Sequence, residues 1–582
     1  MLTCYVYSTK IGEISDISKC FENFVSQALG VLTRIYAAEL RYIKKLAPVA
    51  ALLLTLSITS CVKDLDVTPI DPNLQTEINP NHLFNKCYAN FALAGNSGPN
   101  GDCDIDGLDG GTTGFIRQLF NSNDLTTDEA ICNWTQDEGV TDFNSNSYGS
   151  SNPMLKGFYY RLYFGVTICN QYINNFGDVD KQKTAEVRFI RALDYYLLMD
   201  AFGNIPFTEK VSAESAKQYS RKQMYDYIEK ELLAIENDLM EPKAKKSTDA
   251  NYGRVDKAAV WMLLSRLYLN AEVYTGTAEW QKAADYAKKV INSPYQLYTG
   301  ATVNGWTAYQ QLFMGDNGEN GASVEAIFPI LQDGKRTAAY GGTVFLINAC
   351  YDKAATVNSN GVAGGNLYDN ANWAGVRARK DLIDKFFPNN NAPSVTGAVM
   401  PKEAGDDRAL FDGVDRTITQ ETSKDLSTFT KGFAVVKYNN FYSTGATAKD
   451  LRYADTDFFF FRVAEAYLTY AEATARLNGG QTTTKGTDLI NKLHVRAHAK
   501  PRTSGAYTLN DILNEWCKEF YFEGRRRVDL VRFNKFGGNV NYNWAWKGGE
   551  LNGRNFAATR NIFAIPNSDM IVNTNLKQNP GY

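Results

Sequence analysis

Apolar side chains recur at helical spacing through several blocks of this 582-residue chain, and this pattern restricts it to folds built largely from packed helices. In residues 184–203 the spacing predicts a helix with one apolar face, formed by Val187, Ile190, Leu193 and Leu197. Gly203 stands where that helix should end, since glycine is the usual residue after a helix C-terminus. Similar amphipathic helices are predicted at 224–239, 256–274 and 279–293.

The stretches 256–274 and 279–293 follow one another across a short Thr-Gly-Thr turn. Both carry small residues that permit close helix contact, namely Ala258, Ala259, Ala283 and Ala284. This predicts a helical hairpin of tetratricopeptide type, although the spacing is too irregular for a strict repeat array.

A second helical block is predicted at 458–478, 486–499 and 508–533. There Thr508 is the expected N-cap, with Asp511 three residues on. We therefore predict a mainly α fold whose helical-hairpin scaffold lies mainly in 156–295 and 457–536.

Two regions lack helical periodicity. Residues 96–155 are rich in Gly, Asp, Asn, Ser and Thr, and residues 296–456 mix short β-like runs at 326–331 and 433–438 with Gly/Asn loops. Long irregular segments on a helical scaffold are usually ordered and functional. We expect the ligand-binding loops in these two regions.

Residues 41–61 have the layout of an export signal. Arg41, Lys44 and Lys45 precede an apolar run at 46–56, which small residues separate from Cys61. The run is too short to span a bilayer comfortably, and a buried core helix is the structural alternative. A cysteine at this place resembles the lipobox of bacterial lipoproteins, which implies that 40–60 is a signal peptide and that Cys61 carries lipid.

The segment upstream of this signal has no role in export. We hypothesise that translation begins at Leu40, read from an alternative start codon, and that residues 1–39 are an untranslated or mis-annotated extension. A peptide from 1–39 found in cells would refute this.

The formal charge of −3 gives no general electrostatic reason to expect nucleic acid as a partner. The one short basic run, Arg525–Arg527, has Glu519, Glu523 and Asp529 nearby, so internal ion pairing is the better interpretation. The cysteines beyond Cys61 lack CxxC spacing, and His494 and His498 lack a third ligand, so no disulfide framework or zinc site is predicted.

Several blocks resemble the SusD/RagB family of outer-membrane nutrient-binding lipoproteins in Bacteroidetes. They are "AEVRFIRALDYYLLMDAFGNIPF", "DKAAVWMLLSRLYLNAEVYTG", "FFRVAEAYLTYAEA", "EFYFEGRRRVDLVRF" and the terminal "NLKQNPGY", and the likeness runs in order through 61–582. It implies a single domain anchored in the outer membrane, facing the cell exterior and capping a SusC-like TonB-dependent transporter. It also implies a binding protein rather than an enzyme, with no cofactor. Lys63-Asp64 resembles the short signal for the outer face.

Loops such as "DIDGLDGGTTGF", "ILQDGKRTAAYGG" and "WAWKGGELNG" resemble the starch-binding members of that family. A sugar ring needs aromatic plates for its C–H face and polar groups for its hydroxyls. The resemblance implies three plates, one arginine fork and one acceptor: Tyr340, Trp373, Trp134, Arg117 and Asp109. The ligand would then be starch or malto-oligosaccharide. The structural alternative is that each aromatic residue belongs to the core.

Two positions depart from the starch-binding pattern. Cys132 stands where another tryptophan is expected, and Asp137 stands where an asparagine is expected. An ionised aspartate accepts hydrogen bonds but donates none. These changes leave a different glycan open as the ligand.

Three other functions or ligands remain open from the sequence. A surface glycoside hydrolase would need two carboxylates at a defined separation, and no such motif stands out. A scaffold role would need no sugar binding. Asp102, Asp104 and Asp106 fit the first half of an EF-hand loop, but Thr113 replaces its last ligand, so a structural calcium ion there, or at 315–320, is the less favoured interpretation.

Overall fold

The computed structural model describes residues 78–95, 98, 103–367, 372–538 and 540–582. From Asn79 to Tyr582 they form one compact unit. The predicted signal at 40–60, the lipidation site Cys61 and the upstream segment 1–39 lie outside the described residues. Within the described part of the chain, every helix is too short or too polar to cross a membrane.

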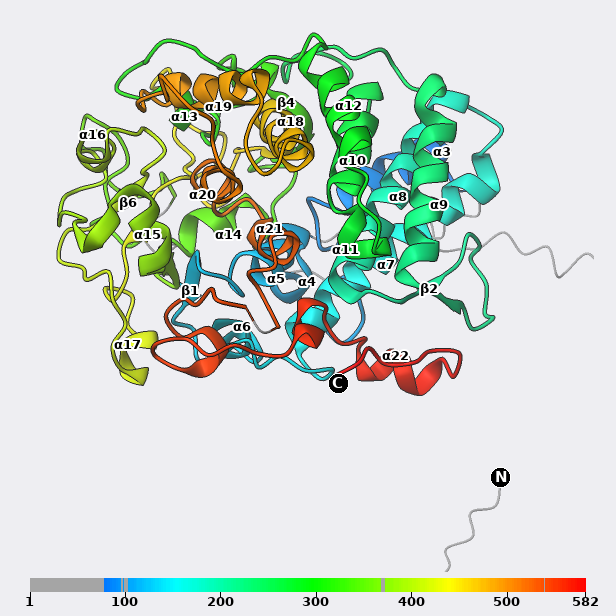
Figure 1. The fold of residues 1–582 in the computed structure, drawn as a ribbon. Helices are drawn as coiled ribbons and strands as arrows, with labels where there is room; N and C mark the ends of the chain where they lie inside the picture. Colours follow the sequence, from blue (N-terminus) through cyan, green and yellow to red (C-terminus); the bar gives the residue numbers. More distant parts are fainter. Residues whose placement is uncertain (1–77, 96–97, 99–102, 368–371, 539) are drawn as a thin grey trace, which may run out of the picture. The chain divides into compact units, whose positions relative to one another are not determined.

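The prediction of a mainly α fold is confirmed. Helices that are consecutive or close in sequence pack against each other, as α7 does on α8, α8 on α9 and α10 on α12 (Figure 1). The scaffold helices are α3 (Pro80–Ala89), α7 (Pro153–Phe176), α8 (Lys181–Phe202), α9 (Arg221–Ile235), α10 (Lys257–Leu269), α11 (Ala271–Thr275), α12 (Trp280–Ile291), α18 (Val463–Leu477), α19 (Thr484–Arg496), α20 (Leu509–Phe520) and α21 (Arg526–Arg532).

The hairpin of α10 and α12 forms as predicted. Gly276 closes the connecting turn with φ +78°, and Ala258, Ala259, Ala283 and Ala284 are all buried. Small side chains let helix axes approach closely, and α12 uses its buried face against α18 as well as α10. The contact between α12 and α18 joins the two helical blocks into one scaffold.

Predicted helix ends are confirmed at Gly203, with φ +69°, and at Thr508, which forms a capping box with Asp511. Three boundaries differ from the prediction. Residues 458–462 form strand β8 instead of helix. The stretch 508–533 breaks at Phe522, where φ is +63°, and 256–274 breaks after Leu269 into α10 and α11.

Most short elements lie in the two irregular regions and the C-terminal part, and a few lie within the helical blocks. Antiparallel strand pairs are β1 (Ala130–Cys132) with β5 (Val376–Ala378), β2 (Ile205–Phe207) with β3 (Lys217–Tyr219), β4 (Ala326–Ile330) with β8 (Phe458–Arg462), and β6 (Phe411–Asp412) with β7 (Ala434–Val435). Short α-helices are α4 (Gly110–Thr113), α5 (Phe115–Asn123), α6 (Val140–Ser145), α13 (Ala308–Gln311), α14 (Thr343–Asn348), α15 (Lys380–Phe386), α16 (Met400–Ala404), α17 (Ser423–Leu426) and α22 (Asn567–Val572). Single 3₁₀ turns are η1 (Glu236–Asp238), η2 (Ala322–Val324), η3 (Pro388–Asn390), η4 (Lys547–Gly549) and η5 (Ala558–Asn561).

The arginine run of the second helical block is engaged in buried ion pairs, as predicted. Of the acids expected nearby, Asp529 is a partner, whereas Glu519 and Glu523 pair with Arg462 instead. Arg526 pairs with Asp128 at 2.7 Å, and Arg525 pairs with Asp529 at 3.0 Å. Arg527 pairs with Asp200 of α8, which ties this block to the first. All three arginines are buried, and a buried charge that lost its partner would cost about 3–5 kcal/mol.

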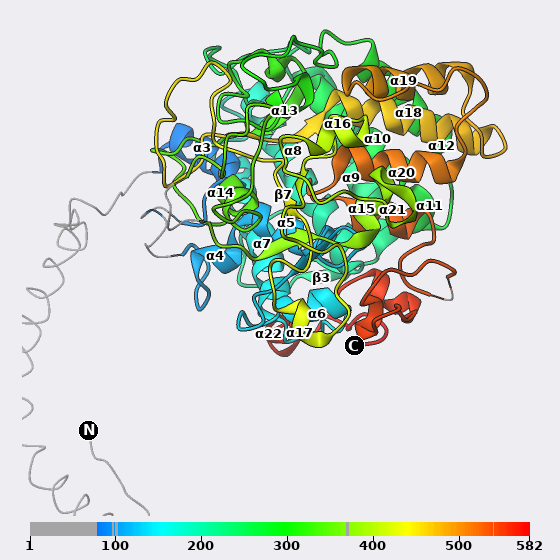
Figure 2. The same ribbon diagram turned by 90° about the vertical axis from the view of Figure 1, so that its left-hand side faces the viewer.

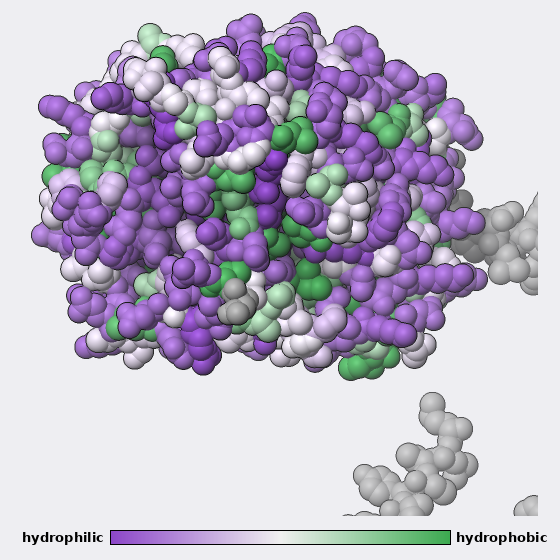
Figure 3. Space-filling view, viewed as in Figure 1, coloured by the Kyte–Doolittle hydropathy of each residue, from purple (hydrophilic) through white to green (hydrophobic). Residues whose placement is uncertain are grey.

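The face seen in Figure 3 is mainly hydrophilic, with apolar residues in small separate groups.

Candidate functional site

The pairing of β1 with β5 brings two predicted plates together, Trp134 just after β1 and Trp373 just before β5. Beyond the strand ends, the backbone amide of Asn133 donates to Gly375 at 2.9 Å. The ring of Trp134 lies over Gly375, where an added Cβ would stand 2.1 Å from a ring carbon. A glycine at this position is therefore required for the ring to occupy its place.

Trp134, Trp373 and Tyr340 form a row of three rings with inclined planes, which we call the aromatic arc. The ring centroids of Trp134 and Trp373 are 6.1 Å apart with their planes inclined at 56°. Those of Trp373 and Tyr340 are also 6.1 Å apart, inclined at 60°. All three side chains are partly exposed, and Trp134 and Trp373 also pack against the hydrophobic core.

Tyr340 is held by contacts on both sides. After it, Gly341 lies against Gly114, and a Cβ built on Gly341 would stand 2.6 Å from the Cα of Gly114. The hydroxyl of Tyr340 accepts a hydrogen bond from Arg452 at 3.1 Å, and the ring centroid of Tyr340 lies 5.5 Å from that of Tyr453. Helices α4, α5 and α14, which flank this region, lie together in Figure 2.

Arg117, in the first turn of α5, reaches the arc. Its Nη2 lies 3.1 Å from Oδ2 of Asp137, and its guanidinium carbon lies 5.8 Å from the centroid of the Trp134 ring. The same carbon lies 5.3 Å from the ring centroid of Phe345. Its buried Nε has no hydrogen-bond partner among the described residues. The structure thus joins Arg117 to the arc, with the departure residue Asp137 as its ionic partner.

Asp109 is the N-cap of α4 and accepts hydrogen bonds from the amide and hydroxyl of Thr112, at 2.9 and 2.5 Å. Partial burial works to raise the pKa of Asp109, but these hydrogen bonds and the charge of Arg117 outweigh it, and the pKa lies below its ordinary value. Asp109 is thus an ionised acceptor close to Arg117.

Cys132 lies in the core and adds nothing to the arc. It is 2% exposed in β1, opposite Val376, and burial raises the pKa of its thiol to about 11. The place of an expected fourth plate is thus taken by a small, unreactive core residue.

The sequence analysis missed Phe345, Arg452 and Tyr453, which contact Arg117 or Tyr340. A tyrosine next to an arginine in a polar loop was the available signal for the last two. Phe345 lies in a short apolar helix, where nothing in the sequence distinguishes it from ordinary core.

In the two acidic loops considered for calcium, the described aspartates make other contacts. Asp102 lies outside the described residues, and Asp104 pairs with Lys86 at 3.1 Å and Arg161 at 3.3 Å. In the second loop, Asp316 accepts hydrogen bonds from Ser443. Among the residues that the structure describes, no three His, Cys, Asp or Glu side chains are grouped to hold a metal ion.

Comparisons with known proteins agree with this architecture. The model of the SusD family matches residues 325–582, and a model described as starch-binding associating with outer membrane matches residues 65–269. The starch-binding protein SusD of Bacteroides thetaiotaomicron is 38% identical over 577 residues, which cover 93% of this chain and 99% of that protein. The chain belongs to the SusD family.

Solved structures show the same SusD-family fold. A SusD superfamily protein from Parabacteroides distasonis has a TM-score of 0.61 at 19% identity, over 87% of this chain and 100% of that one. Surface glycan-binding protein A from Bacteroides thetaiotaomicron, in complex with laminarihexaose, has a TM-score of 0.58 at 19% identity, over 86% and 98%. At these identities the likeness concerns the fold alone. Lipoproteins and the outer membrane are typical of the SusD family.

Proposed function

We propose that this chain is a cell-surface lipoprotein that captures starch or related α-glucan oligosaccharides on the aromatic arc. The inclination of neighbouring rings in the arc is the observation that carries the proposal. Neighbouring ring planes are inclined at 56° and 60°, so the three rings do not form one flat platform. An α-1,4-glucan coils, and consecutive sugar faces turn with it.

Polar groups beside the arc complement the sugar rim. Arg117 presents a planar set of donors, and the carboxyl oxygens of Asp109 and Asp137 accept from hydroxyl groups. A pyranose offers both kinds of partner around an apolar face, which is the combination found here. The name of the starch-binding relative supports the same ligand class.

The wider proposal concerns location and delivery. Cys61 carries the lipid that anchors the protein at the outer face of the outer membrane, and bound glucan passes to a SusC-like TonB-dependent transporter. The lipobox-like sequence and family membership support this.

Capture without cleavage is the proposed activity. Two carboxyl groups beside Arg117, those of Asp109 and Asp137, are engaged as a helix cap and as the ionic partner of Arg117. The pKa of Asp109 lies below its ordinary value, so Asp109 is not the neutral acid that a glycosidase needs to protonate its leaving group. Purified protein incubated with starch should release no reducing sugar; release would establish the hydrolase instead.

Affinity electrophoresis tests the ligand directly. The protein should be retarded in native gels that contain amylopectin and should run freely in gels that contain laminarin, a β-glucan. Retardation by laminarin alone would replace the α-glucan with another glycan. Free migration in both gels would leave only the scaffold role.

A further inference from the structure

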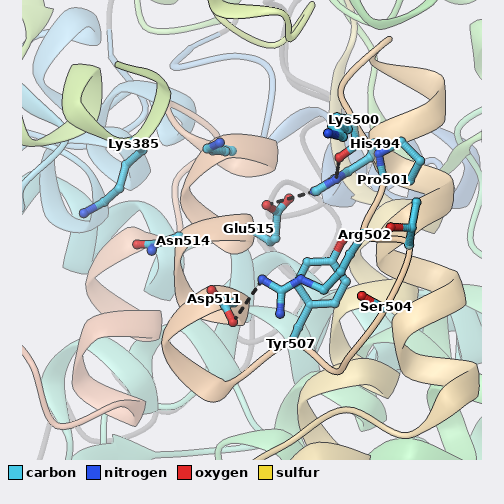
Figure 4. Close-up of a pocket in the computed structure, with 12 residues that line it drawn as sticks. Lys385, His494, Lys500, Pro501, Arg502, Ser504, Tyr507, Asp511, Asn514 and Glu515 are labelled. Atoms are coloured by element: carbon cyan, nitrogen blue, oxygen red, sulfur yellow. Dashed lines mark hydrogen bonds and ion pairs between the residues drawn. The ribbon is translucent and has the colours of Figure 1, made fainter. Parts of the chain in front are cut away.

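A cavity that includes none of the arc residues lies against helix α20. It measures about 440 Å³ and is lined by residues of α15, α19, α20 and the segment 500–507. Figure 4 shows Lys385 on one side of it and Lys500 and Arg502 on the other, with Asn514 and Glu515 between them. Asp511, Asn514, Glu515 and Lys518 recur at helical spacing, so one face of α20 forms its floor.

The carboxylates of this cavity are already engaged. Glu515 lies 3.0 Å from the buried Arg408 and 3.0 Å from His494, and its side chain is only 8% exposed. Asp511 caps α20 by accepting from the amide and hydroxyl of Thr508, and Arg502 lies 3.4 Å from it. Neither acid is free to serve as the main partner of a ligand.

The cations of this cavity are mostly unengaged. Lys500 and Lys518 have no ion pair or side-chain hydrogen bond with any described residue, and Lys385 makes one long hydrogen bond, 3.3 Å, to the hydroxyl of Tyr542. Lys518 only lies over the ring of Phe386, at 5.2 Å. An ammonium group donates three hydrogen bonds and accepts none. Thr503, Ser504 and Asn514 also have no side-chain hydrogen bond with any described residue, so the unused capacity of the cavity consists mainly of three ammonium groups together with two hydroxyls and one amide.

We propose that this cavity binds a small multivalent oxyanion, in which phosphate or carboxylate groups contact Lys385, Lys500 and Lys518. Such groups accept several charge-assisted hydrogen bonds, which matches the unused donors. The volume accommodates a free anion or one carried on a single sugar unit. The site is separate from the aromatic arc and does not depend on glucan binding there.

Calorimetric titration of the purified chain with inorganic phosphate, glucose 6-phosphate and glucose tests the site. Both phosphates should bind and glucose should not, and binding should weaken as ionic strength rises. Tighter binding of glucose 6-phosphate than of inorganic phosphate would identify the ligand as an anion carried on a sugar. Equal binding of the two would identify the ligand as a free anion. Equal heats for glucose, or no binding of either phosphate at low ionic strength, would overturn the proposal.

The double variant Lys500→Ala/Lys518→Ala should lose at least tenfold in phosphate affinity. Its matched control is Lys485→Ala/Lys492→Ala, which removes two exposed lysines from the same part of the chain outside the cavity. The control should stay within about twofold of the unmodified protein, because its two lysines lie outside the cavity. Both variants change the net charge equally, so a difference between them does not come from net charge. An equal loss in both would show that phosphate senses only net charge, which contradicts the site. Amylopectin retardation should persist in both, which confirms folding.

Discussion

The backbone amide of Arg117 donates a hydrogen bond to the carbonyl oxygen of Gly341 at 3.0 Å. This bond ties the first turn of α5 to the loop that carries Tyr340. It places the guanidinium and one ring of the aromatic arc in a fixed relation before any ligand arrives. Such preorganisation lowers the entropy cost of binding.

Replacing Gly341 with alanine should disrupt this link. The new Cβ would stand 2.6 Å from the Cα of Gly114, where neither backbone can yield. We expect a loss of about 1–3 kcal/mol in the free energy of unfolding, measured with urea, and weaker amylopectin retardation. Gly149→Ala is the matched control, because nothing lies within 4 Å of its added Cβ. Equal stability of the two variants would contradict the close approach.

Asp137→Asn should strengthen glucan binding. The change frees Nη2 of Arg117 from an ion pair whose acid is 44% exposed, so the cost in folding stability should stay below about 1 kcal/mol. The amide can also donate to a sugar hydroxyl, and one hydrogen bond corresponds to an affinity gain of about two- to tenfold. Calorimetry with maltoheptaose measures this. Weaker binding would show that the Asp137 carboxylate itself is needed.

Cys132→Trp should fail to add a ring to the arc. The site is closed by the core, so the larger side chain should cost about 1–3 kcal/mol or more in unfolding free energy without any gain in glucan affinity. Cys132→Ala serves as the control for removal of the thiol. A stable tryptophan variant with tighter binding would show that this position opens toward the ligand.

Asp457 makes stability depend on pH. Burial raises the pKa of this carboxyl to about 7, against hydrogen bonds from the amide of Gln332 and the hydroxyl of Tyr252. Since the folded state holds the proton more tightly than the unfolded state, this contribution is full below about pH 4 and is lost as the pH rises to about 7.

Asp457→Asn should remove that dependence, because the amide does not titrate: its oxygen can accept from the amide of Gln332, and its NH2 group can donate to the hydroxyl of Tyr252. Between pH 5 and 7 the unmodified protein should lose up to about 1.4 kcal/mol per pH unit relative to the variant. Urea unfolding at several pH values measures the difference. Parallel curves for the two proteins would mean that Asp457 is ionised in the folded state throughout.

Local sequence signals predicted the scaffold well where one helix face is apolar and the end is marked. Gly203 and the Thr508–Asp511 pair are such signals. Helix α5 escaped detection because it is only nine residues long and lies in a stretch rich in Gly, Asn and Thr, and its polar residues Gln118 and Asn121 are buried along with its apolar face. Strand β8 escaped because its run of phenylalanines has no period, and its partner β4 is far away in sequence.

The candidate site, too, could be predicted from the sequence only in part. Resemblance indicated the residues Trp134, Tyr340 and Trp373, but not their spacing or tilt, which depend on the β1–β5 pairing and on the Gly114–Gly341 approach. The resemblance did not predict the ion pair of Arg117 with Asp137 either, because this pair joins a helix to a loop through tertiary packing alone.

Trp373→Ala, titrated with maltoheptaose, tests the central claim most directly. The ring lies between the other two in the arc, so its loss should remove amylopectin retardation and weaken maltoheptaose binding at least tenfold, since stacking and burial of one such ring are worth about 1.5–3 kcal/mol. Trp280→Ala, a partly exposed tryptophan on α12, should bind as the unmodified protein does. Unchanged retardation and affinity in Trp373→Ala, with the fold intact, would contradict the account and place any glucan site elsewhere.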